Sequence, residues 1–176
     1  ATAFQAPEQR ALLLAVAEAK LKSLEPCRKQ AQEERDVEAA EGLQAERDAQ
    51  FLAGARQVKA HIEKGAIEEA AEALQATAAA AGTPGQQAEV QALGREILHA
   101  VAKKGELPGF SLLDSITAAI AHQAAEREAL RGAFRGFEDA LRAGRLEEAH
   151  EMQCYLASFQ SLPAEFLSLY RNRLVA

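Results

Sequence analysis

The sequence predicts an all-α fold: an antiparallel helical bundle of six or seven helices, built from helix hairpins, with one long central helix. Hydrophobic residues make up 48% of the chain but aromatic residues only 5%, and much of the apolar content is alanine, which suits closely packed helices. Apolar residues also recur at spacings of three and four. No segment alternates with the period of two that is typical of a strand.

A hairpin pattern that occurs twice in the same register is the third observation. In residues 58–70 and 138–149, a helix ends at a glycine and an acidic helix begins within two residues. Glycine readily adopts the left-handed backbone that ends a helix, and carboxylates favour the positive N-terminus of the next one. Residues 28–43 contain a fainter third copy around Asp36.

The first elements follow from these signals in chain order. The first helix covers residues 7–24, and Pro26 interrupts or kinks it because proline lacks the N–H group that a helix interior uses. A second helix either spans residues 27–64 or breaks around Asp36. A third helix covers residues 66–80, after the first of the two hairpin turns.

Residues 82–85, Gly-Thr-Pro-Gly, form the strongest boundary in the chain. Thr83 is predicted to cap the helix that follows, and Gln86 completes a capping box with it. We therefore expect an N-terminal helical hairpin region over residues 1–81 and a C-terminal helical bundle region over residues 86–176. One continuous domain is the alternative.

The long central helix is predicted to run from Ser111, where Asp114 supports a cap, to Ala143. Two shorter helices follow, one over residues 146–159 and one from residue 162 onward. The last of these is expected to dock on the central helix by burying Phe166 and Leu169.

The central helix has three faces when it is placed on a wheel of 100° per residue. The residues expected to mediate helix packing lie on its apolar and small-residue faces, and they are Phe134, Phe137, Leu141, Gly132 and Gly136. Each glycine inside a helix costs roughly 1 kcal/mol relative to alanine. We expect this cost to be offset by the close approach of a neighbouring helix at both glycines.

The third face is a strip of four arginines, the candidate partner-binding residues, and they are Arg127, Arg131, Arg135 and Arg142. Guanidinium groups pair bidentately with carboxylates and phosphates, so the strip is predicted to receive an acidic helix or a phosphorylated segment. A solvated face, offset by Glu128, Glu138 and Asp139, is the alternative. Nucleic acid is disfavoured as a ligand because the net charge is −6.

The sequence contains no pattern that indicates catalysis, so we expect a protein without catalytic residues, bound metal or cofactor. It lacks a nucleophile elbow and a phosphate-binding loop. The two cysteines stand far apart and outside metal-binding spacing, which indicates reduced thiols in a cytoplasmic protein, with a disulfide between them as the alternative. No apolar run approaches the roughly 18 residues that span a bilayer.

Two Glu-x-x-His pairs, Glu96 with His99 and Glu147 with His150, superficially resemble the ligand set of ferritin-like di-iron carboxylate bundles. His150 lies only about one turn into a short helix, which disfavours a metal at the bundle centre. A ferritin-like di-metal bundle is therefore one alternative function, and nucleic-acid binding through the arginine strip is another.

The favoured hypothesis is a non-catalytic helical protein–protein interaction module, such as an adaptor, scaffold or assembly factor. Its partner is predicted to be a protein, acidic or helical, that binds a helix face or extends the N-terminal helices as a coiled coil. Self-association into a homo-oligomer is left open.

Overall fold

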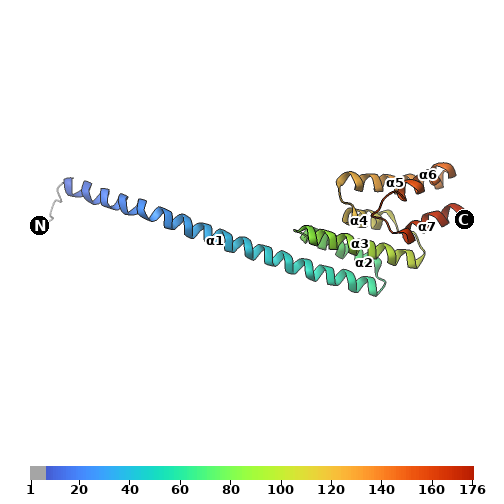
Figure 1. Cartoon of the computed structure of the whole chain (residues 1–176), viewed down its shortest axis with the longest axis horizontal. Helices are drawn as coiled ribbons and strands as arrows, with labels where there is room; N and C mark the ends of the chain where they lie inside the picture. Colours follow the sequence, from blue (N-terminus) through green and yellow to red (C-terminus); the bar gives the residue numbers. More distant parts are fainter. Residues whose placement is uncertain (1–6) are drawn as a thin grey trace. The chain divides into compact units, whose positions relative to one another are not determined.

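The structure is a computed structural model, and it describes residues 7–176. These residues form seven helices and no strand, which confirms the all-α bundle (Figure 1). The helices are α1 (Pro7–Glu63), α2 (Ile67–Ala80), α3 (Pro84–Lys104), α4 (Phe110–Ile120), α5 (Ala124–Arg142), α6 (Leu146–Leu156) and α7 (Ala164–Val175).

The chain divides into two compact units. The first is Ala1–Glu46, and its described part is the N-terminal portion of α1. The second is Arg47–Ala176, which contains the rest of α1 and the helices α2 to α7. The Gly-Thr-Pro-Gly boundary lies within the second unit, between α2 and α3. The expected regions 1–81 and 86–176 therefore stay a prediction.

Helix α1 is continuous where the sequence predicts an interruption. The interruption predicted at Pro26 and the alternative break at Asp36 are both wrong, because α1 runs from Pro7 to Glu63. Proline removes one backbone hydrogen bond, and the carbonyl that it leaves free can bind water in an exposed helix. Strong helix formers surround Pro26, and at Asp36 a hydrogen bond of 2.9 Å from Gln32 Nε2 fits the helical i, i+4 spacing.

Both hairpin turns form as predicted. Gly65 and Gly144 have left-handed φ values of 71° and 69°. The residue after each glycine donates its N–H back to a carbonyl five residues earlier, at 2.9 Å from Ala66 and 2.8 Å from Arg145. These bonds complete the motif that closes a helix C-terminus, and acidic residues fill the first turns of α2 and α6.

The start of α3 is also confirmed. The Thr83 hydroxyl accepts a hydrogen bond from the Gln86 N–H, and the Gln86 side chain accepts one from the Thr83 N–H, each at 3.2 Å. Pro84 occupies the first turn, where its missing N–H has no partner to lose.

The predicted central helix over residues 111–143 is wrong, because the chain breaks at residues 121–123 between α4 and α5. The Glu126 carboxylate accepts the His122 N–H at 2.7 Å and the Ser161 hydroxyl at 2.9 Å, which supports a new helix start. The break lets α4 pack on α2 and α3 while α5 packs on α6. The long helix of this fold is instead α1.

The expected cap at the start of that segment is absent as well. Helix α4 begins at Phe110, one residue before Ser111, and its N-cap residue Gly109 makes no side-chain cap hydrogen bond. The Asp114 carboxylate instead forms an ion pair with Arg131 of α5, at 3.0 Å.

Four aromatic side chains form the centre of the second unit, and all are at most 2% exposed. Phe134 and Phe137 come from α5, and Phe166 and Tyr170 come from α7. The Tyr170 ring lies 4.9 Å from that of Phe137 and 5.5 Å from those of Phe134 and Phe166, measured between centroids. These distances suit favourable aromatic packing, and the expected burial of Phe166 is confirmed.

Tyr170 should make the fold sensitive to alkali. Burial raises the pKa of Tyr170 well above its ordinary value of 10.0, the Glu138 carboxylate adds to this rise, and Arg173 opposes it. Above about pH 10 the unfolded chain loses the tyrosine proton and the folded chain keeps it, so rising pH favours unfolding by about 1.4 kcal/mol per pH unit. We expect urea midpoints to fall less steeply with pH in Tyr170→Phe than in the wild type. The control Tyr155→Phe, at a residue that is 47% exposed, should follow the wild type.

Candidate functional site

The structure places most of the arginine strip within the molecule's own ion pairs. Arg127 and Arg131 approach Asp114 of α4, with nitrogen–oxygen distances of 4.0 and 3.0 Å. Arg142 pairs with Asp139 at 4.0 Å. Among the described residues, Arg135 is exposed and makes no ion pair. Partner binding through all four arginines stays a prediction. Arg135, and Arg142 with its exposed and loose pair, are the members of the strip whose charges are most accessible.

The ion pairs of Asp114 connect two helices across the break at residues 121–123. Asp114 Oδ1 and the Nε atoms of Arg127 and Arg131 are buried, and none has an aligned hydrogen bond. The short contact from Arg131 Nε to Asp114 Oδ1 is therefore a charge contact rather than a well-directed hydrogen bond. The three side chains remain about one third exposed, so the cluster links α4 to α5 through partly screened charge contacts.

The expected helix-packing residues of α5 meet different surroundings. Phe134 and Phe137 are buried, and Leu141 packs partly buried against the core, as predicted. A Cβ on Gly136 would lie 3.2 Å from Met152 Sδ of α6, so a neighbouring helix does approach there. Gly132 is exposed, and a Cβ added to it would meet nothing within 4 Å. The close approach predicted at Gly132 is therefore wrong, because that face of α5 points to solvent.

Two other glycines permit the close helix contacts that were expected on α5. The backbone of Gly54 in α1 lies against Thr77 of α2, and Gly94 in α3 lies against the Ile120 side chain of α4. A Cβ at Gly94 would also be 3.5 Å from Leu74 Cδ2. Neither glycine belongs to a pair spaced by four, which is why the sequence pattern missed them. The signal in the sequence that could have indicated these contacts is the glycine itself, because glycine inside a helix lowers helix propensity and needs a compensating reason.

The two Glu-x-x-His pairs lie apart on α3 and α6. His99 Nδ1 is 3.5 Å from the Glu165 carboxylate of α7, and His150 Nε2 is 3.7 Å from Cys154 Sγ. Within residues 7–176, no three histidine, cysteine, aspartate or glutamate side chains are grouped so that they could hold a metal ion. Cys27 and Cys154 are both free thiols.

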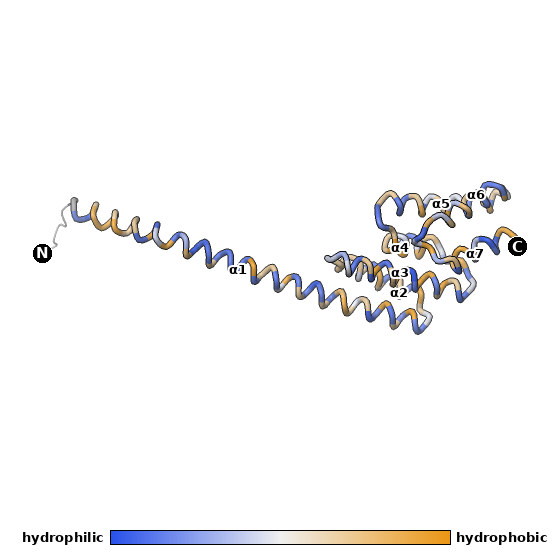
Figure 2. The backbone as a smooth tube through the Cα atoms, viewed as in Figure 1, coloured by the Kyte–Doolittle hydropathy of each residue, from blue (hydrophilic) through white to orange (hydrophobic). Residues whose placement is uncertain are grey.

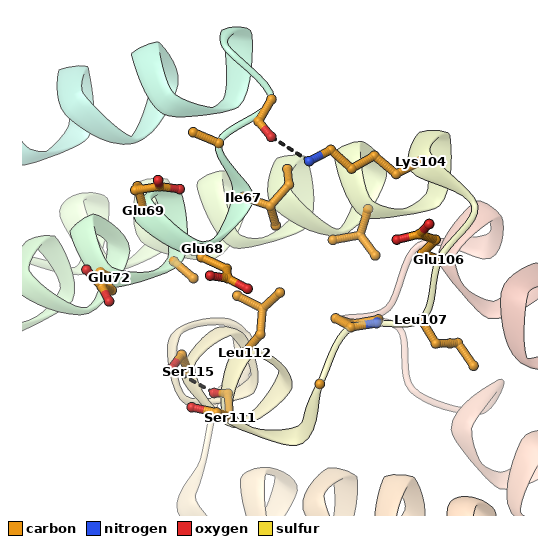
Figure 3. Close-up of a pocket in the computed structure, with 16 residues that line it drawn as sticks. Ile67, Glu68, Glu69, Glu72, Lys104, Glu106, Leu107, Ser111, Leu112 and Ser115 are labelled. Atoms are coloured by element: carbon orange, nitrogen blue, oxygen red, sulfur yellow. Dashed lines mark hydrogen bonds between the residues drawn. The ribbon is translucent and has the colours of Figure 1, made fainter.

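A groove of about 610 Å³ opens in the second unit (Figure 3). It is lined by the start of α2, the end of α3, the loop over residues 105–109 and the start of α4. Its carboxylates are Glu68, Glu69 and Glu72 from α2 and Glu106 from the loop. The lining contains a single lysine, Lys104, which donates a 2.6 Å hydrogen bond to the Gly65 carbonyl. Because four carboxylates outnumber this one ammonium group, the groove is acidic.

Apolar side chains form the rest of this groove. Ile67 and Val101 are buried beneath it, and Leu112 is partly exposed along its side. Acidic walls with apolar side chains between them favour a cationic or amphipathic ligand over an anionic one. Sequence reasoning missed the groove because its lining comes from four separate segments.

The other notable surface is the part of α1 in the first unit, residues 7–46, which we call the arm. Every side chain that the structure describes in the arm is exposed. Large apolar residues are among them, including Leu12 at 70%, Leu14 at 64%, Leu21 at 52% and Leu24 at 49% exposure. Figure 2 shows hydrophobic residues recurring along α1.

The exposure of the arm is unusual for a helix of this length. In proteins, most helical stability comes from packing an apolar face and less from intrinsic propensity. Single exposed leucines are ordinary, but a dense group of them on one helix makes the arm a candidate interaction surface.

Comparison of the chain with known protein families, characterised proteins and solved structures finds no match in any of the three. None of the described helices combines the length and the apolar character that crossing a membrane requires. The fold and its surfaces thus define the class of the protein: an all-α helical bundle with an acidic groove and an exposed helical arm.

Proposed function

We propose that the protein is a non-catalytic helical interaction module that binds a helical protein partner through the arm. One observation carries the proposal: residues 7–46 are helical, and all of their described side chains are exposed, leucines included. An exposed helix that contains this many leucines is better suited to binding another molecule than to facing water. Scaffolds, adaptors and assembly factors use such helices.

The leucines are arranged for recognition by another helix. Leu14, Ala17, Leu21 and Leu24 follow the spacing of three and four that is typical of a seam between paired helices. Full burial of one leucine contributes about 1.5–3 kcal/mol. Covering the three leucines of this stripe would thus contribute several kcal/mol, enough to offset the ordering of exposed side chains.

The other surfaces support the proposal less directly. Arg135 and the acidic groove are accessible for secondary contacts with a partner of mixed charge. Nucleic-acid binding would draw on Arg127 and Arg131, whose charges already face Asp114. A di-metal site would draw on Glu96 and His99, and His99 faces Glu165 instead. No observation favours either alternative function over the interaction module.

Affinity capture with quantitative mass spectrometry tests the proposal, using the full chain as bait. Leu21→Glu/Leu24→Glu should reduce the bound partner, or bound copies of the chain itself, at least tenfold. The matched control Ala19→Glu/Gln30→Glu adds the same charge away from the stripe and should bind like the wild type. Two results would contradict the proposal: equal capture by the leucine variant, or a wild-type chain that binds nothing and sediments as an inert monomer.

A further inference from the structure

We infer that the partner of the arm is a second copy of this chain, paired with it in antiparallel orientation. The inference rests on the proposed function and specifies its partner. It follows from the heptad spacing, the side-chain sizes and the charges along residues 14–45, whose described side chains are all exposed.

The apolar stripe of the arm continues as a heptad. Beyond Leu14, Ala17, Leu21 and Leu24, the same spacing of three and four selects six further positions, which together with these four we call the seam. The six are Arg28, Ala31, Arg35, Glu38, Gly42 and Ala45. All three leucines of the seam lie among its first four positions, and the six positions that follow are small or charged.

This asymmetry fits an antiparallel partner. If Leu24 faces Gly42 of the second copy, the heptads of the two helices align, and Leu21 faces Ala45. Leu21 and Leu24 then each meet a small residue. Gly42 has room for this, because nothing lies within 4 Å of the position its Cβ would take.

The charged positions of the seam complement each other in the same register. Arg28 faces Glu38 of the second copy, and by symmetry this pair forms twice. Arg35 faces Ala31, whose small side chain leaves space for the aliphatic stem of the arginine. Opposite charges in a partly desolvated seam select one register and orientation over others.

A parallel in-register pair would have the opposite consequence. Arg28, Arg35 and Glu38 would each face the identical residue of the other copy, and three like-charge contacts would lie in the seam. Like charges that are directly opposed destabilise an interface and are used to reject wrong partners.

The wider charge distribution agrees with the antiparallel register. Residues 20–29 contain four basic and one acidic side chain, whereas residues 37–46 contain three acidic and no basic side chain. The antiparallel register places these two segments beside each other, twice per dimer. Two flanking contacts are unfavourable: Glu34 faces Glu34 of the second copy near the twofold axis, and Glu18 faces Glu46 of the second copy on the other flank.

Sedimentation of the full chain over a range of concentrations tests self-association. We expect a dimer for the wild type and for Ala19→Glu/Gln30→Glu, and a monomer for Leu21→Glu/Leu24→Glu. Arg28→Glu should weaken the dimer at least tenfold, and the exchanged variant Arg28→Glu/Glu38→Arg should recover it, because the pair is restored with reversed polarity. Glu34→Gln should tighten the dimer about twofold by removing the like-charge contact.

Disulfide trapping tests the orientation through the exposed thiol of Cys27. In the antiparallel register, Cys27 flanks Glu41 of the second copy and lies about 14 residues, or about 21 Å along the helix, from the other Cys27. In a Cys154→Ala background, adding Glu41→Cys should give a dimer linked between positions 27 and 41. Cys27 alone should give little linked dimer.

The outcomes separate this inference from the proposed function. A monomeric wild-type chain whose binding to another protein still depends on Leu21 and Leu24 would overturn the antiparallel dimer and leave the interaction module intact. A dimer that links efficiently through Cys27 alone, and that the exchanged variant fails to recover, would overturn the antiparallel register. A chain that neither dimerises nor binds another protein would overturn both proposals.

Discussion

Replacing Phe137 by alanine should lower the free energy of unfolding by about 3–5 kcal/mol, the usual cost of removing a buried phenylalanine. The Phe137 side chain is fully buried, and its ring meets that of Tyr170 at 4.9 Å and 75° in an edge-on arrangement. The substitution removes apolar burial and an aromatic contact at once, and rigid neighbours fill the space only in part. Urea unfolding can be followed by tyrosine fluorescence, since the chain has two tyrosines and no tryptophan.

Leu146→Ala is the matched control for this experiment. Leu146 begins α6 and is 58% exposed, so its truncation should change the free energy of unfolding by no more than about 0.5 kcal/mol. Equal effects of the two substitutions would show that the aromatic cluster does not form the core of the second unit.

Alanine should have opposite effects at two glycines that lie inside helices. At Gly94 the new Cβ meets the Ile120 side chain, which is itself 1% exposed and held by the core. We expect Gly94→Ala to lower the free energy of unfolding by about 1–3 kcal/mol through overpacking, despite a gain of about 1 kcal/mol in helix propensity. At Gly132 the new Cβ meets nothing within 4 Å, so Gly132→Ala should raise stability by about 1 kcal/mol.

A double-substitution cycle checks the cause of the effect at Gly94. Ile120→Ala makes room for the added methyl group, so the cost of Gly94→Ala should be smaller in that background than in the wild type. Additive costs, or stabilisation by alanine at both glycines, would contradict the close contact between α3 and α4.

Three signals at helix ends were predicted correctly, whereas the cap expected at Ser111 does not form. The turns at Gly65 and Gly144 and the capping box of Thr83 and Gln86 all form where the sequence places them. In each case the chemistry is complete within one helix end, because a left-handed glycine or a capping side chain satisfies nearby backbone groups.

Interruptions of helices were predicted poorly, and for opposite reasons. Pro26 is a strong local signal, yet α1 continues through it, because an exposed helix loses only one hydrogen bond there and water can replace the partner. Residues 121–123 contain neither glycine nor proline, yet the chain breaks there. The break depends on contacts of Glu126 with distant Ser161 and on the packing of α4 against α2 and α3.

The candidate sites divide in the same way. The leucine stripe of the arm can be predicted from the spacing of its residues, because all of them lie on one helix and no other element is involved. The arginine strip could be read as a strip, but its pairing with Asp114 could not, since the break between α4 and α5 brings the two helices together. The acidic groove was invisible for the same reason.

Composition and periodicity were enough to determine the helical class, the hairpin turns and the apolar stripe, because these depend on interactions between residues at most five apart. Tertiary structure alone decided which glycines contact a neighbouring helix, where the predicted central helix divides, and which arginines form ion pairs with another helix. Those outcomes depend on the volumes and charges of side chains that are distant in sequence and meet only when the helices pack.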